Sequence, residues 1–495
     1  MPQHPVNPGR RAALSGLAAS GAVLAFPALI PAACAQPAAT GPALRSSAFR
    51  SFRDAVARWS RTGGTLIVDA DHVESAPVTM LCVPGLSYRL SSDAPRTISY
   101  SGPHYHWLFC IYSEGRNPFV IDGALTFDGR DNCSLPFFAR FENVEGAARR
   151  DFSVDGLAAR NARMKSGVSR VDGSPTNGYG ATAMLFSGGF DHLVLRRVQV
   201  SSVTREAGAG RAGSQGCVGI GVVANLLGTQ SARHIGIEDF QVSRVDSDDR
   251  PGSAQRADMD GILVFQSAEA SGTRPVIQRG TIREAAGRAI KVFAPGGGGV
   301  TRDVTVHRSV HGKTGGSNDI AHQHGDGTIE DIRFFYTGDA HSQPTVPIGL
   351  SSGTARPPAF PFAEGIVRNV TIDDRTGRPK RAIVSVYYNV EDAAPRRYRI
   401  ADISDSGSAQ FLLLPGALGN YGPAAIEIER VSVDLAAGLM STEDYDRQLT
   451  VTARGLVNRN PRPAPFKVFY DGRTAPPGHG GTVFIADATV RGIAR

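Results

Sequence analysis

Leu195-Arg196-Arg197-Val198-Gln199-Val200 is one copy of a six-residue pattern that runs through most of the chain. The pattern is an apolar residue, two residues that are often Asp, Asn, Glu or Arg, a second apolar residue, a polar residue and a third apolar residue. Close copies begin at Ile237, Ile329, Val367, Ile428 and Ile485, and looser copies span residues 277–282, 300–306 and 400–404. Such a recurrence is typical of a protein built from stacked structural units.

A second short apolar stretch lies between these copies and completes the unit. Examples are residues 183–186, 218–222, 261–265, 289–293 and 382–386. From Ala183 through Gly219, Gly261, Ala289 and Asp319 the offsets are 36, 42, 28 and 30 residues. One such unit cannot bury its apolar side alone, but stacked units form a continuous core with alternate residues pointing inward. Because the loops vary while the strands repeat, a parallel β-helix is favoured over a propeller or a sandwich.

The N-terminal part predicts a cap for this coil. Residues 49–59 carry apolar groups at helical spacing, and the helix ends in Thr62-Gly63-Gly64 before a strand at residues 65–68. These residues, with Val120-Ile121-Asp122-Gly123 and Asp128-Gly129, resemble the first rungs of the pectin-lyase-like superfamily of pectate lyases, polygalacturonases and phage tailspike depolymerases. The resemblance implies an all-β, right-handed, single-stranded parallel β-helix with a short N-terminal capping helix over residues 47–495.

The first 35 residues predict an export signal. Arg10-Arg11 precedes an apolar run over residues 12–33, which closes on Ala33-Cys34-Ala35. The paired arginines resemble a twin-arginine signal, which carries folded proteins across a bacterial membrane. Residues 36–46 read as a flexible linker. Since no later apolar run approaches the ~18 residues that a membrane span needs, we expect a periplasmic or secreted protein without a membrane span.

Composition and charge exclude several classes of protein. With 41% hydrophobic and 20% charged residues and 57 Gly among 495, the chain is not collagen, a coiled coil or a disordered protein. The net charge is +7, and +5 once the signal is removed, with Lys and Arg dispersed. This balance favours an acidic partner and argues against nucleic acid. Four cysteines remain after cleavage, and both a disulfide and unpaired buried thiols stay open.

The polar residues with the most chemistry fall on three consecutive rungs. Aligning Ile262, Ile290 and Ile320 places Asp260, Arg288 and Asn318 about 5 Å apart on neighbouring strands. Lys291 would then point outward from the same strand as Arg288. The complete set predicted to share one external groove is Asp248, Asp249, Asp258, Asp260, Arg288, Lys291, Asn318, His322 and His324.

Glycoside hydrolysis is one chemistry that this set fits. It needs a general acid and a second carboxylate about 5–9.5 Å apart, which Asp258 or Asp260 with Asp248 or Asp249 would supply. Arg288 and Lys291 look like the substrate clamp of polygalacturonases. The chain departs from that family, because Asp258-Met259-Asp260 replaces its Asn-x-Asp and the Gly-His-Gly at residues 478–480 follows the clamp.

β-Elimination of a uronate polysaccharide is the chemistry that the positive charge favours. Arg288 would hold the substrate carboxylate, with Lys291 or His322 as base. Asp258 and Asp260 are counted among the catalytic residues as well. Asp248, Asp258 and Asp260 would supply oxygen ligands for a Ca²⁺ ion. The other groove residues, Asp248, Asp249, Asn318 and His324, would bind the substrate.

The sequence thus predicts an exported enzyme that cleaves an acidic polysaccharide, by β-elimination before hydrolysis. The alternatives are a polygalacturonase-like hydrolase, a uronate epimerase and a non-catalytic glycan-binding or structural β-helix, in which Arg288 and Asp260 form an ion pair between rungs.

Overall fold

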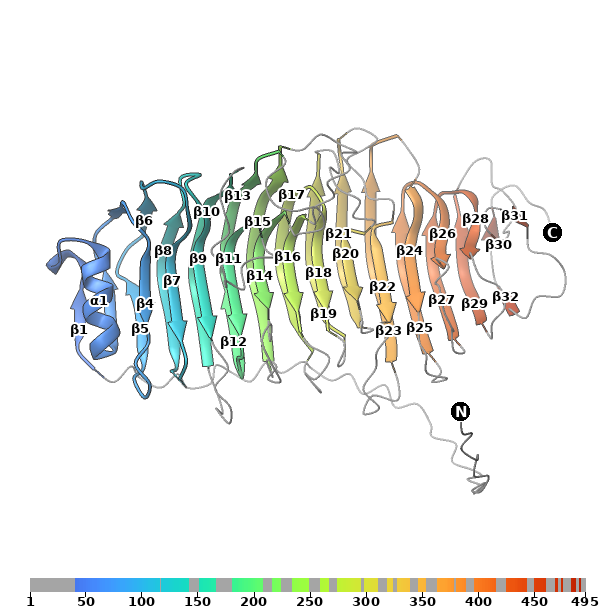
Figure 1. Ribbon diagram of the computed structural model, residues 1–495. Helices are drawn as coiled ribbons and strands as arrows, with labels where there is room; N and C mark the ends of the chain where they lie inside the picture. The colour runs from blue at the N-terminus through green and yellow to red at the C-terminus, as the bar shows by residue number, and fades with distance from the viewer. Residues whose placement is uncertain are drawn as a thin grey trace, which may run out of the picture. The chain divides into compact units, whose positions relative to one another are not determined.

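The computed structural model describes residues 41–490 except 116, 142–150, 166–179, 208–215, 224–233, 249–258, 267–273, 295–297, 310–317, 324–326, 339–345, 353–362, 378–379, 389–395, 415–423, 443–448, 460–467, 471–472, 475–481 and 487–488. Its strands stack in chain order and form two sheets, so the chain coils between the sheets as it advances (Figure 1). This is the all-β parallel β-helix that the sequence predicts.

Sheet A has 19 strands, and neighbours that pair are parallel. They are β1 (Ala43–Arg45), β2 (Gly64–Val68), β3 (His72–Glu74), β5 (Tyr88–Ser92), β6 (Arg96–Tyr100), β8 (Phe119–Asp128), β10 (Asp151–Met164), β12 (His192–Arg196), β13 (Gln199–Arg205), β15 (His234–Ser247), β17 (Val276–Ala285), β19 (Val300–Arg308), β21 (Thr328–Tyr336), β23 (Ala363–Asp374), β25 (Arg396–Asp405), β27 (Ala424–Val433), β29 (Leu449–Asn458), β32 (Thr482–Ala486) and β33 (Thr489–Val490).

Sheet B has 14 strands and is parallel up to its last pair, β30 with β31, which is antiparallel. The strands are β4 (Val78–Leu81), β7 (Tyr105–Ser113), β9 (Cys133–Phe141), β11 (Ala181–Gly188), β14 (Cys217–Val223), β16 (Met259–Phe265), β18 (Arg288–Phe293), β20 (Ile320–Gln323), β22 (Ile348–Ser352), β24 (Lys380–Tyr388), β26 (Ser408–Leu414), β28 (Leu435–Thr442), β30 (Val468–Tyr470) and β31 (Arg473–Thr474).

The six-residue pattern is the bend in the strands of sheet A. Its second polar residue has a left-handed backbone, for example Asp239 (φ 53°), Asp331 (φ 57°) and Asn369 (φ 53°). Asp and Asn tolerate this conformation better than most residues. The bend restarts the alternation of side chains, so the apolar residues on both of its sides point into the core and the polar residue after it points outward. The sequence repeat therefore encodes one change of direction per rung.

The core lies between the two sheets and runs from Phe52 to Leu456 in the described part of the chain. Val200 and Val242, the inward residues after the bend in two neighbouring strands, are at most 3% exposed. Near the N-terminus the stack contains aromatic rings, such as Phe119 over Phe152 at 5.0 Å between ring centroids. Each fully buried large apolar side chain contributes about 1.5–3 kcal/mol to folding. Stacking therefore supplies the apolar burial that a single rung cannot achieve.

Helix α1 (Phe52–Thr62) covers the first rungs, preceded by the short 3₁₀ turn η1 (Ser46–Ala48). Ser51 caps the helix by accepting a hydrogen bond from the Asp54 amide at 3.1 Å. Trp59 is fully buried and donates its indole N–H to the Gly64 carbonyl at 2.9 Å. This agrees with the predicted helix and following strand.

Two further sequence expectations concern the cysteines and the membrane. The described cysteines Cys82, Cys110, Cys133 and Cys217 are all buried and form no disulfide with one another, which agrees with the alternative of buried thiols. The described helices include none with the length and hydropathy that a membrane crossing requires. Residues 1–40, which hold the predicted signal and the first five residues of the predicted linker, lie outside the described residues.

Candidate functional site

The predicted alignment of three sheet B strands is confirmed. Ile262 pairs with Ile290, and Ile290 pairs with Ile320. Asp260 is in register with Arg288, and the guanidinium lies 3.5 Å from the carboxylate. The Asp260 side chain is fully buried and that of Arg288 is 13% exposed. The two residues therefore form an ion pair between rungs, which was the structural alternative for them.

A corner in sheet B separates this pair from the core strand. The registers skip Gly261 opposite Ala289, and the chain turns there. A Cβ on Gly261 would lie 2.6 Å from the Ala289 carbonyl oxygen, so a side chain at this position would collide with the next rung. On the next rung Asp319 occupies the position equivalent to Ala289. The amide of Ile290, the residue after Ala289, donates a hydrogen bond to the Asp319 carbonyl at 2.9 Å.

Asp319 places a carboxylate inside the coil at that corner. Its side chain is fully buried, forms an ion pair with Arg308 and accepts a hydrogen bond from the Tyr336 hydroxyl at 2.7 Å. Arg308, 2% exposed, also donates to the carbonyls of Gly287 and Ala286 at 3.1 and 2.9 Å. Burial raises the pKa of Asp319, and Arg308 opposes that shift. No motif in the sequence indicates this network, although Asp319 is the last position in the series of repeat offsets.

Two of the residues predicted to line an external groove are buried instead. His322 is in register with Val292 and Leu350, both buried. It is fully buried, with its Nε2 atom 3.0 Å from the Thr301 hydroxyl, and burial lowers its pKa to about 3. Asn318 is buried too, and its amide nitrogen donates to the Val346 carbonyl at 3.0 Å.

The expectation that His322 and Asn318 face a shared external groove is therefore wrong. In His322 the reason is strand alternation, which points every second side chain into the coil. The Asn318 amide also donates to the Ser385 hydroxyl at 3.2 Å, so its donors serve the protein itself.

The remaining predicted residues are only partly brought together. Lys291 points outward as expected, but its register neighbours are Leu263 and Ala321. Asp248 is exposed and paired with Arg163 at 2.7 Å. The other three, Asp249, Asp258 and His324, lie outside the described residues.

The Ca²⁺ prediction stays untested for the same reason. Asp258 was one of its three proposed ligands, and within the described ranges no group of three or more His, Cys, Asp or Glu side chains is arranged to hold a metal ion.

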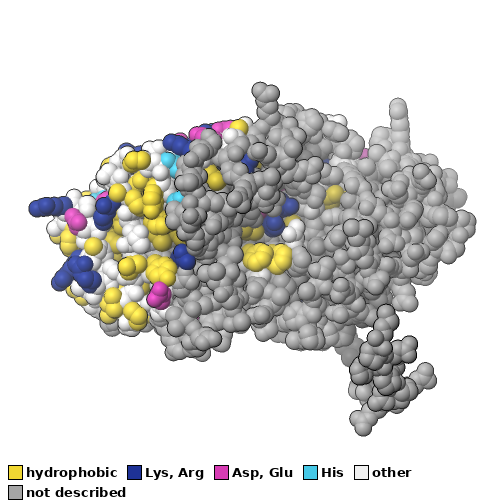
Figure 2. Space-filling model, in the orientation of Figure 1, with side chains coloured by type: hydrophobic (Ala, Val, Ile, Leu, Met, Phe, Trp, Pro, Cys, Tyr) yellow, Lys and Arg dark blue, Asp and Glu magenta, His cyan; other side chains and the backbone are white. Residues whose placement is uncertain are grey.

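The outer face of sheet B is apolar around this region. Leu185 and Val223 are buried there with Phe138, in a second hydrophobic cluster outside the main core. Phe265 stacks on Phe293 at 4.4 Å between ring centroids. Figure 2 shows hydrophobic side chains gathered over the N-terminal strands at the left of the view.

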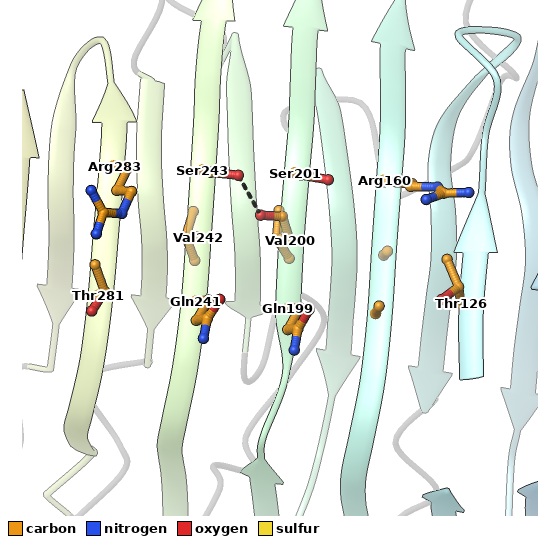
Figure 3. A pocket seen from close by; sticks show the side chains of 12 residues that line it. Thr126, Arg160, Gln199, Val200, Ser201, Gln241, Val242, Ser243, Thr281 and Arg283 are labelled. Atoms are coloured by element: carbon orange, nitrogen blue, oxygen red, sulfur yellow. Dashed lines mark hydrogen bonds between the residues drawn. The ribbon is translucent and has the colours of Figure 1, made fainter. Parts of the chain in front are cut away.

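A polar cleft lies instead on the outer face of sheet A. It has a volume of about 320 Å³ and crosses the strands β8, β10, β13, β15 and β17 (Figure 3). Its outward side chains are Thr126, Ala158, Arg160, Gln199, Ser201, Gln241, Ser243, Thr281 and Arg283. Among the residues that the structure describes, no carboxylate lines this cleft.

The cleft consists of two rows of side chains that cross the strands. In the first row Gln199 is in register with Gln241, which is in register with Thr281. In the second row Ser201, Ser243 and Arg283 follow one another in the same way. Because parallel strands are about 4.8 Å apart, a polymer lying along the stack meets similar hydrogen-bonding groups on every rung.

Arginines stand at the two ends of the second row. Arg160 is held by Asp128, with its Nε atom 2.9 Å from the carboxylate. Arg283 is exposed, and no ion pair engages it in the described part of the chain. The cleft thus offers one partly neutralised and one available cation to an anionic ligand.

The second row continues beyond Arg283. Arg283 is in register with His307, and His307 with Phe335. The His307 and Phe335 rings stack at 4.9 Å between centroids with a 12° angle between their planes. Burial and the neighbouring Arg283 lower the pKa of His307, although Glu284 opposes this. The lowered pKa favours the neutral form of the imidazole.

The cleft residues were visible in the sequence but not identified as a site. Gln199 and Gln241 are the polar fifth residue of the six-residue pattern. Each points outward because the apolar residues on either side of it point inward.

The comparisons with known proteins identify no family for this chain. No family model matches the chain, and no curated protein matches it. Among solved structures, the crystal structure of the Agl-KA catalytic domain aligns with 91% of this chain and 70% of its own, at 11% sequence identity and a TM-score of 0.36. A similarity this low carries no argument about activity. Membership of a particular β-helix family and the twin-arginine signal therefore stay predictions.

Proposed function

We propose that the protein is an exported β-helix enzyme that binds an acidic polysaccharide in the sheet A cleft and cleaves it by β-elimination. The observation that carries the proposal is the cleft itself, in which amides and hydroxyls repeat from strand to strand and arginines stand at both ends. Amide and hydroxyl groups hydrogen-bond sugar hydroxyls, and guanidinium groups bind carboxylates with two parallel hydrogen bonds.

The charges of the cleft favour elimination over hydrolysis. Hydrolysis requires two carboxyl groups across the scissile bond, whereas the described lining of the cleft holds cations and neutral polar groups. Elimination requires a cation that neutralises the uronate carboxylate and a base that removes the neighbouring proton. Arg283 is suited to the first role.

A panel of acidic and neutral polysaccharides tests this function. We expect the wild-type protein to release new reducing ends from an acidic polymer, together with the ultraviolet absorbance of an unsaturated sugar. Arg283→Ala should weaken binding of that polymer, while the matched control Arg430→Ala should not, because Arg430 pairs with Asp402 on distant rungs. Reducing ends without absorbance would replace elimination by hydrolysis. Failure to bind any acidic polymer would overturn the proposal.

A further inference from the structure

The row beyond the cleft holds a cation, an imidazole and an aromatic ring on three adjacent strands. Arg283 on β17, His307 on β19 and Phe335 on β21 all point outward from sheet A, and each is in register with the next. Thr305, two residues before His307, is in register with Thr281 of the cleft lining. A ligand that fills the cleft as far as Thr281 and Arg283 therefore has His307 as its next neighbour.

We propose that His307 is the base that removes the substrate proton and that Arg283 binds the carboxylate beside the same carbon. This inference rests on the proposed function and assigns the residues that carry it out. Neither residue was identified in the sequence, where Arg288 was the candidate for binding the carboxylate and Lys291 or His322 the candidate for the base.

The surroundings of His307 fit a base. Its side chain is half-buried, so it is screened from bulk water on one side and accessible on the other. Stacking on Phe335 fixes the plane of the ring. In the part of the chain that the structure describes, no hydrogen bond engages either ring nitrogen. A neutral imidazole with an available lone pair is the form that accepts a proton.

The reaction balances with these two residues and water. Arg283 neutralises the uronate carboxylate and so stabilises the negative charge that develops when the C5–H bond breaks. The proton passes to a ring nitrogen of His307, the electron pair forms the C4–C5 double bond, and the C4–O bond breaks. The leaving oxygen takes a proton from solvent, and the imidazolium returns its own to solvent, so no co-reactant is consumed.

Phe335 and the nearby charges complete the site. Phe335 presents an aromatic ring on the strand after His307, where it positions the imidazole. Arg333 is exposed on the same strand β21 and adds a second cation near the rung. The charged groups that act on His307 are Arg283 and Glu284 on β17, while Arg333 is in register with Thr305, two residues before His307.

The test is His307→Gln, which keeps a polar side chain of similar size but cannot accept the proton. We expect the cleavage rate of the acidic polymer to fall by at least about 100-fold, the lower range for loss of an acid–base group. Binding of the polymer should stay within about threefold of the wild type, because Arg283 and the cleft are unchanged. His192→Gln is the matched control, since His192 also points outward from sheet A but pairs with Asp151 at 2.9 Å.

The outcomes separate this inference from the proposed function. If the wild type cleaves and His307→Gln, with an unchanged unfolding midpoint, cleaves at a similar rate, the assignment of the base is wrong and the function stands. If the wild type binds an acidic polymer without cleaving it, elimination and the assignment both fail, and glycan binding remains. A Phe335→Leu variant should lower the rate by a smaller factor with unchanged binding; an unchanged rate would remove the positioning role.

Discussion

The outer faces of the two sheets differ in what their charged residues do. On sheet B, the buried Asp260 forms an ion pair with the half-buried Arg288, and the face beside them is covered by apolar side chains. On sheet A, Gln, Ser, Thr and Arg side chains line an open cleft, and Arg283 at its edge is exposed. The charged residues that are concentrated in one stretch of sequence therefore form a stabilising ion pair on sheet B. The polar residues that recur over many rungs form the accessible cleft on sheet A.

The physical reason is the cost of burying charge. An ionised group inside a protein is tolerated when another charge and hydrogen bonds compensate it. Asp319 with Arg308 and Tyr336 shows such compensation inside the coil. Outward residues of sheet A face no such requirement, so they can stay available for a ligand.

The largest effect should come from breaking the interior network. Asp319→Ala would leave the Arg308 guanidinium buried without its carboxylate, which typically costs about 3–5 kcal/mol. Chemical denaturation should show this loss as a lower unfolding midpoint. The control is Asp303→Asn, which removes an exposed carboxylate from sheet A but keeps a residue type that tolerates the left-handed backbone at that position (φ 53°), and it should change the midpoint little. Equal midpoints for the two variants would mean that the interior pair does not stabilise the coil.

A pH-dependent effect should come from His322. Burial lowers its folded-state pKa from 6.5 to about 3, so between these values the unfolded chain binds a proton that the folded chain excludes. Stability is therefore complete above pH 6.5 and falls as the pH drops toward 3, by about 1.4 kcal/mol for each unit below the unfolded pKa. His322→Gln should be less stable at pH 8 but should lose less stability on acidification. An acid profile identical to that of the wild type would contradict this role.

Arg288→Ala should have a moderate effect on stability and tests whether the active site lies on sheet A or on sheet B. Removing the partner of the buried Asp260 should lower stability by about 1–3 kcal/mol, while binding and cleavage of an acidic polymer should stay unchanged. Loss of cleavage in Arg288→Ala with intact folding would instead place the active site on sheet B, as the sequence predicted.

The fold could be predicted from the sequence because the same pattern of apolar and polar residues recurs from rung to rung. Apolar residues on both sides of the bend, with Asp or Asn at the left-handed position of many rungs, specify the coil again and again, so the loss of one signal matters little. The predicted strand alignment through Ile262, Ile290 and Ile320 depends on this redundancy, and it is confirmed.

The site could not be predicted in the same way. His322 looks like a ligand or a base in the sequence, but it is in register with the buried Val292 and Leu350 and points into the coil with them. His307 and Arg283 come together through register between strands, which no local pattern displays. The polar fifth residue of the repeat was the available signal, since a row of outward polar groups along a stack predicts a surface for a polymer.

The smallest effect should be a difference in polymer binding between the two arginines at the ends of the cleft. Arg160 is already paired with Asp128 at 2.9 Å, whereas Arg283 has no carboxylate against it in the described ranges. Arg283→Ala should therefore weaken binding of the acidic polymer about tenfold, and Arg160→Ala only about two- to threefold, because exposed and already paired charges contribute little. Titrations at low and high salt should show the larger salt dependence for binding that uses Arg283. Equal losses would mean that the Asp128 carboxylate gives up Arg160 when the polymer binds, and Asp128→Asn would then strengthen binding at that end.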